Sequence, residues 1–339
     1  MRGVKILAGR NLEVRDFPDP TPEGDEVVVR VEAAGLCGTD LHILYEKPWE
    51  APHIPGHEGA GLVVAVDKPK RVKVGDRVFI MAFSTCGRCG PCNAGYFAYC
   101  RSESARMHGF TRDGFQAEYA RVPETQLLPL PEFMTYEHGA VTMDPIGAPF
   151  HAIKRMRTAP GQTVVVFGLG PMGLGATAVA AQLGARVIGV EPIALRRELA
   201  KAVGAAEIVD PTTGDVVEQI RNLTDGKGLD RALECSGQAE SLTAALNLAK
   251  PFGHVAIVAE NAQATIDPSN QFNRKEVTLS GSTVFPVGEY DEITRLFADG
   301  LPVDRFITHR FPIEHAKEAY ELFSTGQTGK VLFTPTAAR

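Results

Sequence analysis

Cysteine, histidine and acidic residues gather in one stretch near the start of the 339-residue chain. Residues 35–58 read GLCGTDLHILYEKPWEAPHIPGHE, with Cys37 at one end and His57 followed by Glu58 at the other. Thiolate sulfur and imidazole nitrogen are ligands that Zn²⁺ favours. Asp144, in TMDPIGAPFHA, is the best downstream candidate for a third ligand. Three protein ligands leave one tetrahedral position open, as in a catalytic rather than a structural zinc site.

A second group of cysteines follows the pattern C-x₂-C-x₂-C-x₇-C, formed by Cys86, Cys89, Cys92 and Cys100. Glycines and a proline in CGRCGPC let the backbone curl around one ion. Four thiolates close a tetrahedron, so the pattern predicts a structural zinc site, with Arg88 and Arg101 offsetting its negative charge. Disulfides or an iron–sulfur cluster are the alternatives. The sixth cysteine, Cys235, is most simply a buried thiol.

A glycine-rich loop, VVVFGLGPMGLGA, contains Gly168, Gly170 and Gly173 as G-x-G-x-x-G, with Met172 among them. The loop follows a predicted strand and opens a predicted helix, which is the context of a dinucleotide-binding turn. Glu191 ends the next strand, where a carboxylate binds ribose hydroxyls and repels a 2′-phosphate, so NAD is favoured over NADP. Arg196 either stacks on adenine, helps to hold a phosphate, or lies on a solvated helix face.

The elements that must position these residues change character along the chain. The first 135 residues predict short strands and long loops, and so a partly open barrel, with strands at 27–31, 61–66, 77–81 and 116–122. From residue 162, buried strands at 163–167, 186–190, 207–209, 230–235, 254–258 and 277–280 are interleaved with helices at 174–183 and 195–203. This alternation predicts a parallel sheet with helices on both faces. Helices at 289–298 and 314–324 and strands at 306–311 and 330–333 complete the chain.

The composition narrows the class of protein. A length of 339 residues predicts two domains, and 44% hydrophobic with 22% charged residues is ordinary for a soluble globular protein. A net charge of −6 argues against a nucleic-acid partner. We expect no membrane span and no signal peptide, and therefore a cytoplasmic location in which cysteines serve as ligands or buried thiols.

GLCGTDLH, PGHEGAG, the four cysteines and the nucleotide loop, in this order, resemble the zinc-dependent medium-chain dehydrogenases, and most of all their sugar-polyol and threonine branch. The resemblance covers nearly the whole chain. It implies an α/β fold, with a Rossmann doubly wound parallel sheet and a β-rich, GroES-like, partly open barrel. The implied domains are a catalytic domain at 1–147 with a zinc lobe at about 84–102, an NAD-binding domain at 148–287, and a return to the catalytic domain at 288–339.

The resemblance also implies one catalytic and one structural zinc per chain, a dimer or tetramer, and roles for side chains near the metal. The catalytic zinc acts as a Lewis acid on an alcohol oxygen. Thr39 and His42 relay the proton to solvent by way of the cofactor ribose. Asp40 accepts a hydrogen bond from the second ring nitrogen of His57 and fixes its tautomer. Glu58 lies near the metal and exchanges with its bound water.

The expected reaction is oxidation of a secondary alcohol, such as a polyol, a sugar or a hydroxy-amino acid like threonine, to a ketone, with hydride transfer to NAD. An NADP-dependent alcohol dehydrogenase or carbonyl reductase, a zinc-free enone reductase and a non-catalytic binder of the same fold are the alternatives. The last two would lack part of the ligand set or the glycine loop. Residues 45–53, which include the single tryptophan Trp49, are expected to line the substrate pocket; Trp49 is equally compatible with a core or an interface.

Overall fold

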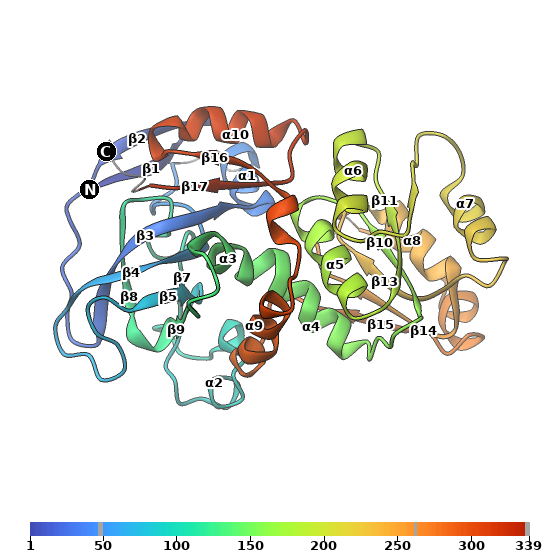
Figure 1. Ribbon diagram of the computed structural model, residues 1–339, viewed down its shortest axis with the longest axis horizontal. Coiled ribbons are helices and arrows are strands. Elements are labelled where there is room, and N and C mark those ends of the chain that lie inside the picture. The colour runs from blue at the N-terminus through green and yellow to red at the C-terminus, as the bar shows by residue number, and fades with distance from the viewer. Residues whose placement is uncertain (47–49, 261–262, 336–339) are drawn as a thin grey trace.

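The computed structural model describes residues 1–46, 50–260 and 263–335, so Trp49 lies outside the described residues. Two lobes lie side by side (Figure 1). One lobe is rich in strands and contains the N-terminus together with the C-terminal strand. The other is built on a parallel sheet flanked by helices.

The parallel sheet has six strands in the order β12-β11-β10-β13-β14-β15, all pairs parallel. Its strands are β10 (Thr163–Phe167), β11 (Arg186–Val190), β12 (Glu207–Val209), β13 (Leu229–Glu234), β14 (Ala249–Ile257) and β15 (Thr278–Gly281). Its helices are α5 (Pro171–Gln182), α6 (Ala194–Ala202), α7 (Val216–Leu223) and α8 (Ala239–Leu248). The order places β10 and its glycine loop at the centre, where the winding direction reverses. The predicted doubly wound sheet is confirmed.

The central strand β10 is buried on both faces, as its run of apolar residues requires. Val164 and Val166 join a core shared with α5 and with residues of the strand-rich lobe such as Phe79. Val165 and Phe167 point the other way, into a separate core built with α7 and α8. Successive side chains of β10 thus point to opposite faces of the sheet, and each face is covered by helices.

The strand-rich lobe is organised around a seven-stranded sheet in the order β16-β17-β3-β4-β5-β9, with β8 also paired to β3. These strands are β16 (Ile307–Phe311), β17 (Lys330–Phe333), β3 (Glu26–Leu36), β4 (Glu58–Val66), β5 (Arg77–Ile80), β9 (Leu127–Pro129) and β8 (Tyr119–Pro123). Strands from both ends of the chain therefore share one sheet. A hairpin of β1 (Arg2–Leu7) and β2 (Asn11–Asp16) lies beside α10 (Ala316–Ser324), which contributes Tyr320 and Phe323 to the core of this lobe.

Several short elements complete the molecule. Between the lobes lie α3 (Tyr136–Val141), the π-helical turn η3 (Thr142–Gly147), α4 (Ala148–Arg155) and α9 (Tyr290–Ala298). The cysteine-rich segment carries β6 (Phe83–Ser84), α2 (Gly90–Asn93), η1 (Phe97–Tyr99) and β7 (Arg106–Met107). The remainder are α1 (Gly38–Glu46), η2 (Glu124–Gln126), η4 (Pro268–Asn273), η5 (Val287–Glu289), η6 (Val303–Arg305) and η7 (Ile313–His315). Among the described residues, no helix combines the length and the apolar character needed to cross a bilayer.

The turn η3 rests directly on α5. A Cβ at Gly175 would lie 1.7 Å from the carbonyl oxygen of Pro145, so only glycine permits this approach. The helix that begins at the nucleotide loop therefore supports the backbone next to Asp144. A proline inside a helix removes one hydrogen bond, and a π-helical turn accommodates this loss.

Candidate metal and dinucleotide site

Four side chains that are distant in sequence meet between the barrel strands and η3. Cys37, His57, Glu58 and Asp144 offer ligand atoms that all lie within 4.8 Å of one another. Cys37 stands between β3 and α1, His57 directly precedes β4, and Asp144 lies on η3. His57 Nε2 is 2.8 Å from Asp144 Oδ2, and Cys37 Sγ is 3.6 Å from the same oxygen. The structure thus brings the three predicted ligands together.

The donor set fits a zinc ion. Zn–S and Zn–O bonds of about 2.3 and 2.1 Å in a tetrahedron put sulfur and oxygen about 3.6 Å apart. That is the Cys37–Asp144 separation of 3.6 Å. The 2.8 Å between His57 and Asp144 is a hydrogen-bond length, which a bound ion would widen by roughly half an ångström. Glu58 Oε2 is buried and has no hydrogen-bond partner among the described residues, so one further acceptor belongs to the cluster.

The acidic side chains around His57, Asp144 and Cys37, favour a positive charge at His57 Nε2. Burial lowers the pKa of His57, but Asp144 and Cys37 outweigh burial and raise it well above its usual value. Burial raises the pKa of Asp144, but His57 outweighs it and lowers that pKa. Burial raises the pKa of the Cys37 thiol, although His57 acts in the opposite direction. A divalent cation supplies the positive charge that these acidic groups otherwise draw from a proton.

One predicted contact at this cluster is wrong. Asp40 does not accept a hydrogen bond from His57, because Asp40 Oδ1 and His57 Nδ1 lie 3.9 Å apart. Within residues 1–46, 50–260 and 263–335, neither atom has a hydrogen-bond partner. The physical reason is that the other carboxylate oxygen, Oδ2, is held by the Cys37 backbone N–H at 3.0 Å and the Gln116 side-chain amide at 3.2 Å.

The two predicted relay residues are placed differently. Thr39 Oγ1 lies 3.5 Å from Cys37 Sγ, beside the cluster. His42 lies on α1 with its side chain 53% exposed and bonded to Glu46 at 2.5 Å. Thr39 therefore contacts a predicted ligand, and His42 contacts solvent.

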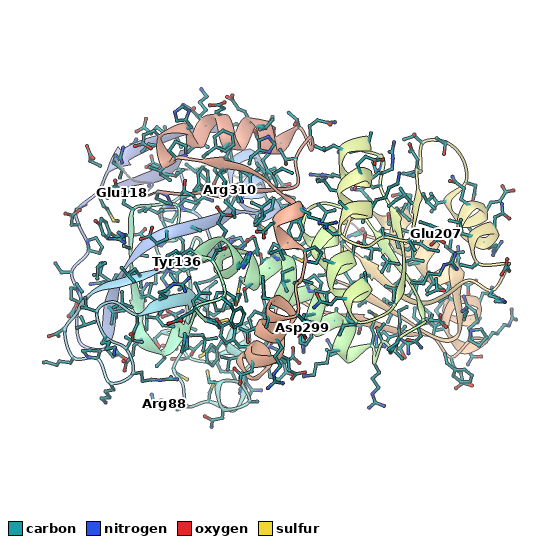
Figure 2. All side chains as sticks on the ribbon, viewed as in Figure 1. Arg88, Glu118, Tyr136, Glu207, Asp299 and Arg310 are labelled. Carbon is teal, nitrogen blue, oxygen red and sulfur yellow. The ribbon has the colours of Figure 1, made fainter. Side chains whose placement is uncertain are left out.

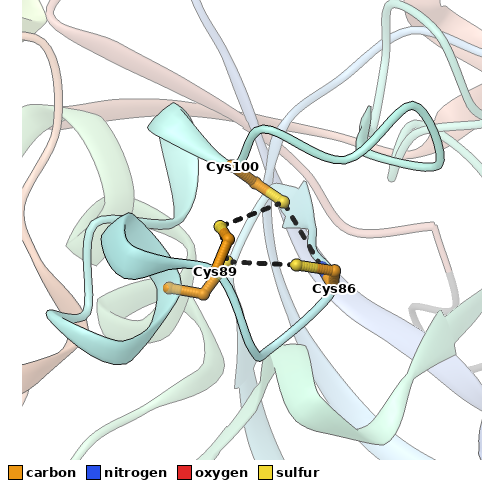
Figure 3. A group of neighbouring side chains, drawn as sticks. Cys86, Cys89 and Cys100 are labelled. Atoms are coloured by element: carbon orange, nitrogen blue, oxygen red, sulfur yellow. Dashed lines mark hydrogen bonds between the residues drawn. The ribbon is translucent and has the colours of Figure 1, made fainter.

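The four remaining predicted ligands form the second group. Figure 3 shows Cys86, Cys89 and Cys100 pointing toward one another. The sulfur atoms of Cys89 and Cys92 are 3.4 Å apart, and those of Cys86–Cys92 and of Cys89–Cys100 are 4.0 Å apart. A zinc ion with four Zn–S bonds of about 2.3 Å needs sulfurs about 3.8 Å apart. Backbone N–H groups lower the pKa of Cys89 to about 6, whereas burial raises that of Cys92 to about 11. Arg88 is exposed on this segment (Figure 2).

The glycine loop has the geometry of a nucleotide cradle. Gly168 has φ +82°, and a Cβ there would meet Ser236 backbone atoms at 2.7 Å; a Cβ on Gly173 would lie 1.8 Å from the Gly168 carbonyl oxygen. A Cβ built on Gly170 would have open space around it, and its nearest neighbour would be Arg196 Nη1 at 3.7 Å. Gly170 caps α5, whose first turn, with Met172, carries no acidic residue and leaves backbone N–H groups for an anion.

Glu191 is buried at the end of β11. Its carboxylate accepts hydrogen bonds from the Leu169 backbone N–H at 2.7 Å and the Ile193 backbone N–H at 3.0 Å. The Arg196 Nε–H is bonded to the Thr328 carbonyl oxygen at 3.0 Å, and burial lowers the pKa of this guanidinium. Glu191 and Arg196 thus flank the glycine loop, and Arg196 is not on a solvated face.

Comparison with known proteins agrees with this geometry. Residues 23–132 match the alcohol dehydrogenase GroES-like domain, and residues 171–299 match the zinc-binding dehydrogenase domain. The chain is 36% identical to an L-threonine 3-dehydrogenase of Pyrococcus horikoshii, over 97% of each chain. The chain belongs to the zinc-dependent medium-chain dehydrogenases. Both the predicted family and the predicted fold class, including the GroES-like barrel, are confirmed.

Two solved structures of this family resemble the dehydrogenase chain over its whole length. The alcohol dehydrogenase TADH from Thermus sp. ATN1 has a TM-score of 0.91 at 30% identity, covering 98% of this chain and 99% of that one. A putative zinc-binding dehydrogenase from Sinorhizobium meliloti, bound to NADP, has a TM-score of 0.88 at 32% identity, with the same coverage of 98% and 99%.

Three residues of this dehydrogenase site were not identified from the sequence. Lys330, the first residue of β17, is buried and donates to Glu58 Oε1 at 2.6 Å and to the Leu36 carbonyl oxygen at 3.0 Å. Burial raises the pKa of Glu58 to about 7, although Lys330 pulls it the other way. The Phe110 ring lies 5.5 Å from that of His57, and Gln116 contacts Asp40. The one available signal was a lone lysine that opens the apolar strand KVLF.

Proposed function

We propose that this dehydrogenase oxidises a secondary alcohol to a ketone and passes the hydride to NAD. The observation that carries the proposal is the convergence of Cys37, His57 and Asp144, with one further carboxylate, in a buried cluster whose η3 backbone rests on the nucleotide-binding helix α5. Membership of a zinc-binding dehydrogenase family supports it.

In this proposal Cys37, His57 and Asp144 hold a zinc ion, which supplies Lewis-acid polarisation of the alcohol oxygen. Lys330 holds one oxygen of Glu58 and so keeps that carboxylate at the edge of the ligand set. The Thr39 hydroxyl would accept the alcohol proton and pass its own proton on, by way of the cofactor ribose, to His42. His42, exposed on the next turn of α1, would release the proton to solvent. Phe110 forms an apolar wall beside His57. The cysteine lobe holds a second, structural zinc.

For the cofactor, Gly168, Gly170, Met172 and Gly173 form the pyrophosphate cradle. The Glu191 carboxylate accepts hydrogen bonds from the ribose hydroxyls, which favours NAD over NADP. Arg196 faces the open space at Gly170 and contributes a positive charge to the phosphates. NADP is the second candidate, since the related Sinorhizobium meliloti structure binds it.

For the substrate, the resemblance to L-threonine 3-dehydrogenases puts hydroxy-amino acids first, followed by polyols and sugars. The proposal includes the division at about residues 147 and 287, a dimer or tetramer, and a cytoplasmic location, all supported by the family resemblance.

The test is a substrate panel measured by the absorbance of reduced nicotinamide. We expect turnover with at least one secondary alcohol, and a kcat/KM for NAD at least about tenfold above that for NADP. Glu191→Ala should narrow this ratio by raising the KM for NAD. Absence of turnover with any alcohol would favour a binder, and preference for NADP would refute the role of Glu191.

A further inference from the structure

A chain of hydrogen bonds runs from α10 to the metal cluster through the interior of the barrel lobe. The Tyr320 hydroxyl donates to Gln116 Oε1 at 2.7 Å, and Gln116 Nε2 donates to Asp40 Oδ2 at 3.2 Å. The Cys37 backbone N–H donates to the same Asp40 oxygen at 3.0 Å. The side chains of Tyr320, Gln116 and Asp40 are fully buried, at 0% exposure.

The Asp40 carboxylate, at the end of this series of hydrogen bonds, determines which group donates in each of them. An ionised carboxylate only accepts hydrogen bonds, so the amide of Gln116 must turn its NH₂ toward Asp40. Its carbonyl oxygen then faces Tyr320, whose hydroxyl must donate. Without that hydroxyl, the buried carbonyl oxygen of Gln116 loses its donor, and Asp40 alone holds the amide. The Gln116 side chain is then less firmly placed against the carboxylate.

The chain leaves one oxygen of Asp40 for His57. Asp40 Oδ1 and His57 Nδ1 are both buried and lie 3.9 Å apart, and neither has a hydrogen-bond partner in the part of the chain that the structure describes. A neutral imidazole carries one N–H and one lone pair. The distance of 3.9 Å is too long for a hydrogen bond, but the negative carboxylate oxygen still favours the N–H at Nδ1. The lone pair is then on Nε2, which is the atom that faces Asp144 at 2.8 Å.

Backbone packing fixes Gln116 against the residue before His57. Gly56 has φ +96°, and a Cβ there would lie 2.7 Å from Gln116 Cγ. The Gln116 N–H donates to the Pro55 carbonyl oxygen at 3.1 Å, and the Phe115 N–H donates to the Gly56 carbonyl oxygen at 3.0 Å. The segment with Gln116 therefore holds both the backbone and the carboxylate neighbour of His57.

We propose that Gln116 and Tyr320 are positioning residues for the metal site: together they hold Asp40 so that His57 presents Nε2 to the ion. The inference rests on the proposed function, because it assumes that Cys37, His57 and Asp144 bind zinc. Through Tyr320, helix α10 would then support a metal site whose ligands are Cys37, His57 and Asp144.

The experiment compares Tyr320→Phe with Tyr290→Phe. Tyr290 is a matched control, since its buried hydroxyl donates to the Pro129 carbonyl oxygen at 2.9 Å and has no contact with this chain of hydrogen bonds. Protein with zinc in the cysteine lobe and Co²⁺ in the catalytic cluster reports the ligand geometry through its visible d–d bands.

We expect Tyr320→Phe to shift these bands, to weaken Co²⁺ and Zn²⁺ affinity at the cluster about tenfold, and to lower kcat with little change in the KM for NAD. Tyr290→Phe should change melting by a similar amount and leave the bands in place. If Tyr320→Phe and Tyr290→Phe have the same bands, metal affinity and kcat, the inference is wrong while the proposed function stands.

A second variant tests the inference if Tyr320→Phe does not fold. Gln116→Met keeps the length of the side chain, removes the donor to Asp40, and should shift the same bands. Unchanged bands in Gln116→Met would overturn the inference. A parent protein that takes up metal only in the cysteine lobe would instead overturn the proposed function, and the inference with it.

Discussion

The two groups proposed to bind metal in this protein are built in opposite ways. The cysteine lobe takes four identical ligands from a span of 15 residues, Cys86 to Cys100, and three of its four cysteines are partly exposed. The proposed catalytic cluster takes different ligand types from residues 37, 57 and 144, and three of its four candidate groups are buried. The lobe can form its site from local backbone alone, whereas the cluster requires the barrel strands and η3 to be in place.

This difference predicts a separation of roles. A closed set of four thiolates has no position for substrate, so the lobe contributes free energy of folding. The cluster has a mixed ligand set, an unpartnered Glu58 oxygen and a buried lysine nearby, so it contributes chemistry. Substituting one ligand in each group tests whether stability and turnover separate in this way.

The largest effect should follow Cys37→Ala. Loss of a thiolate removes the catalytic ion and with it several kcal/mol of transition-state stabilisation, so kcat/KM should fall about a thousandfold or more. Metal analysis should show one zinc lost of two, and melting should change by only a few degrees. A variant that keeps its turnover would show that this cluster is not the catalytic centre.

The mirror experiment is Cys92→Ser, which removes the most buried ligand of the lobe. Losing the cross-link should cost about 3 kcal/mol or more, which lowers Tm by roughly 4 °C or more in a chain of this length. At low temperature kcat should stay within about twofold of the parent, because the catalytic cluster retains its ion. The proposed separation of stability from turnover is wrong if Cys92→Ser keeps both zinc ions and the parent's Tm. It is also wrong if turnover in Cys92→Ser falls as far as in Cys37→Ala.

The same contrast explains what could be predicted from sequence. The spacing of the four cysteines and the G-x-G-x-x-G loop are local patterns, and both have the geometry expected of them. Strands such as Thr163–Phe167 and Arg186–Val190 were predicted to the residue, because continuous apolar runs bounded by turns mark a buried strand. α7 and α8 were not predicted, although Asp215 caps α7 and its apolar residues have helical spacing.

Contacts that close over long sequence distances could not be predicted. Lys330 reaches Glu58 across 272 positions, and Tyr320 reaches Gln116 across 204. The predicted Asp40–His57 hydrogen bond was wrong, since the contacts of Asp40 Oδ2 with Cys37 and Gln116 hold the carboxylate with Oδ1 3.9 Å from His57 Nδ1. The π-helical turn was also unforeseen, because a proline normally ends a helix.

The smallest effect concerns His108, which lies in the stretch that connects the lobe to the Gln116 segment. His108 is fully buried, and its ring nitrogens contact the Asp113 carbonyl oxygen at 2.5 Å and Gln126 Oε1 at 3.4 Å. Burial, reinforced by Arg112, lowers its pKa to about 4. The unfolded value is about 6.5, so the folded protein resists protonation that the unfolded chain accepts.

Stability should therefore be unaffected by His108 above pH 6.5 and should fall as the pH drops from 6.5 toward 4, by about 2 kcal/mol at pH 5. His108→Gln should remove this part of the acid sensitivity, so its Tm difference between pH 7.5 and pH 5 should be a few degrees smaller than in the parent. His315→Gln, at an exposed histidine, is the control and should leave that difference unchanged. If the lobe and the cluster are independent, His108→Gln also keeps both zinc ions and its turnover at pH 7.5. A loss of catalytic zinc in this variant would mean that the connecting stretch couples the two metal groups.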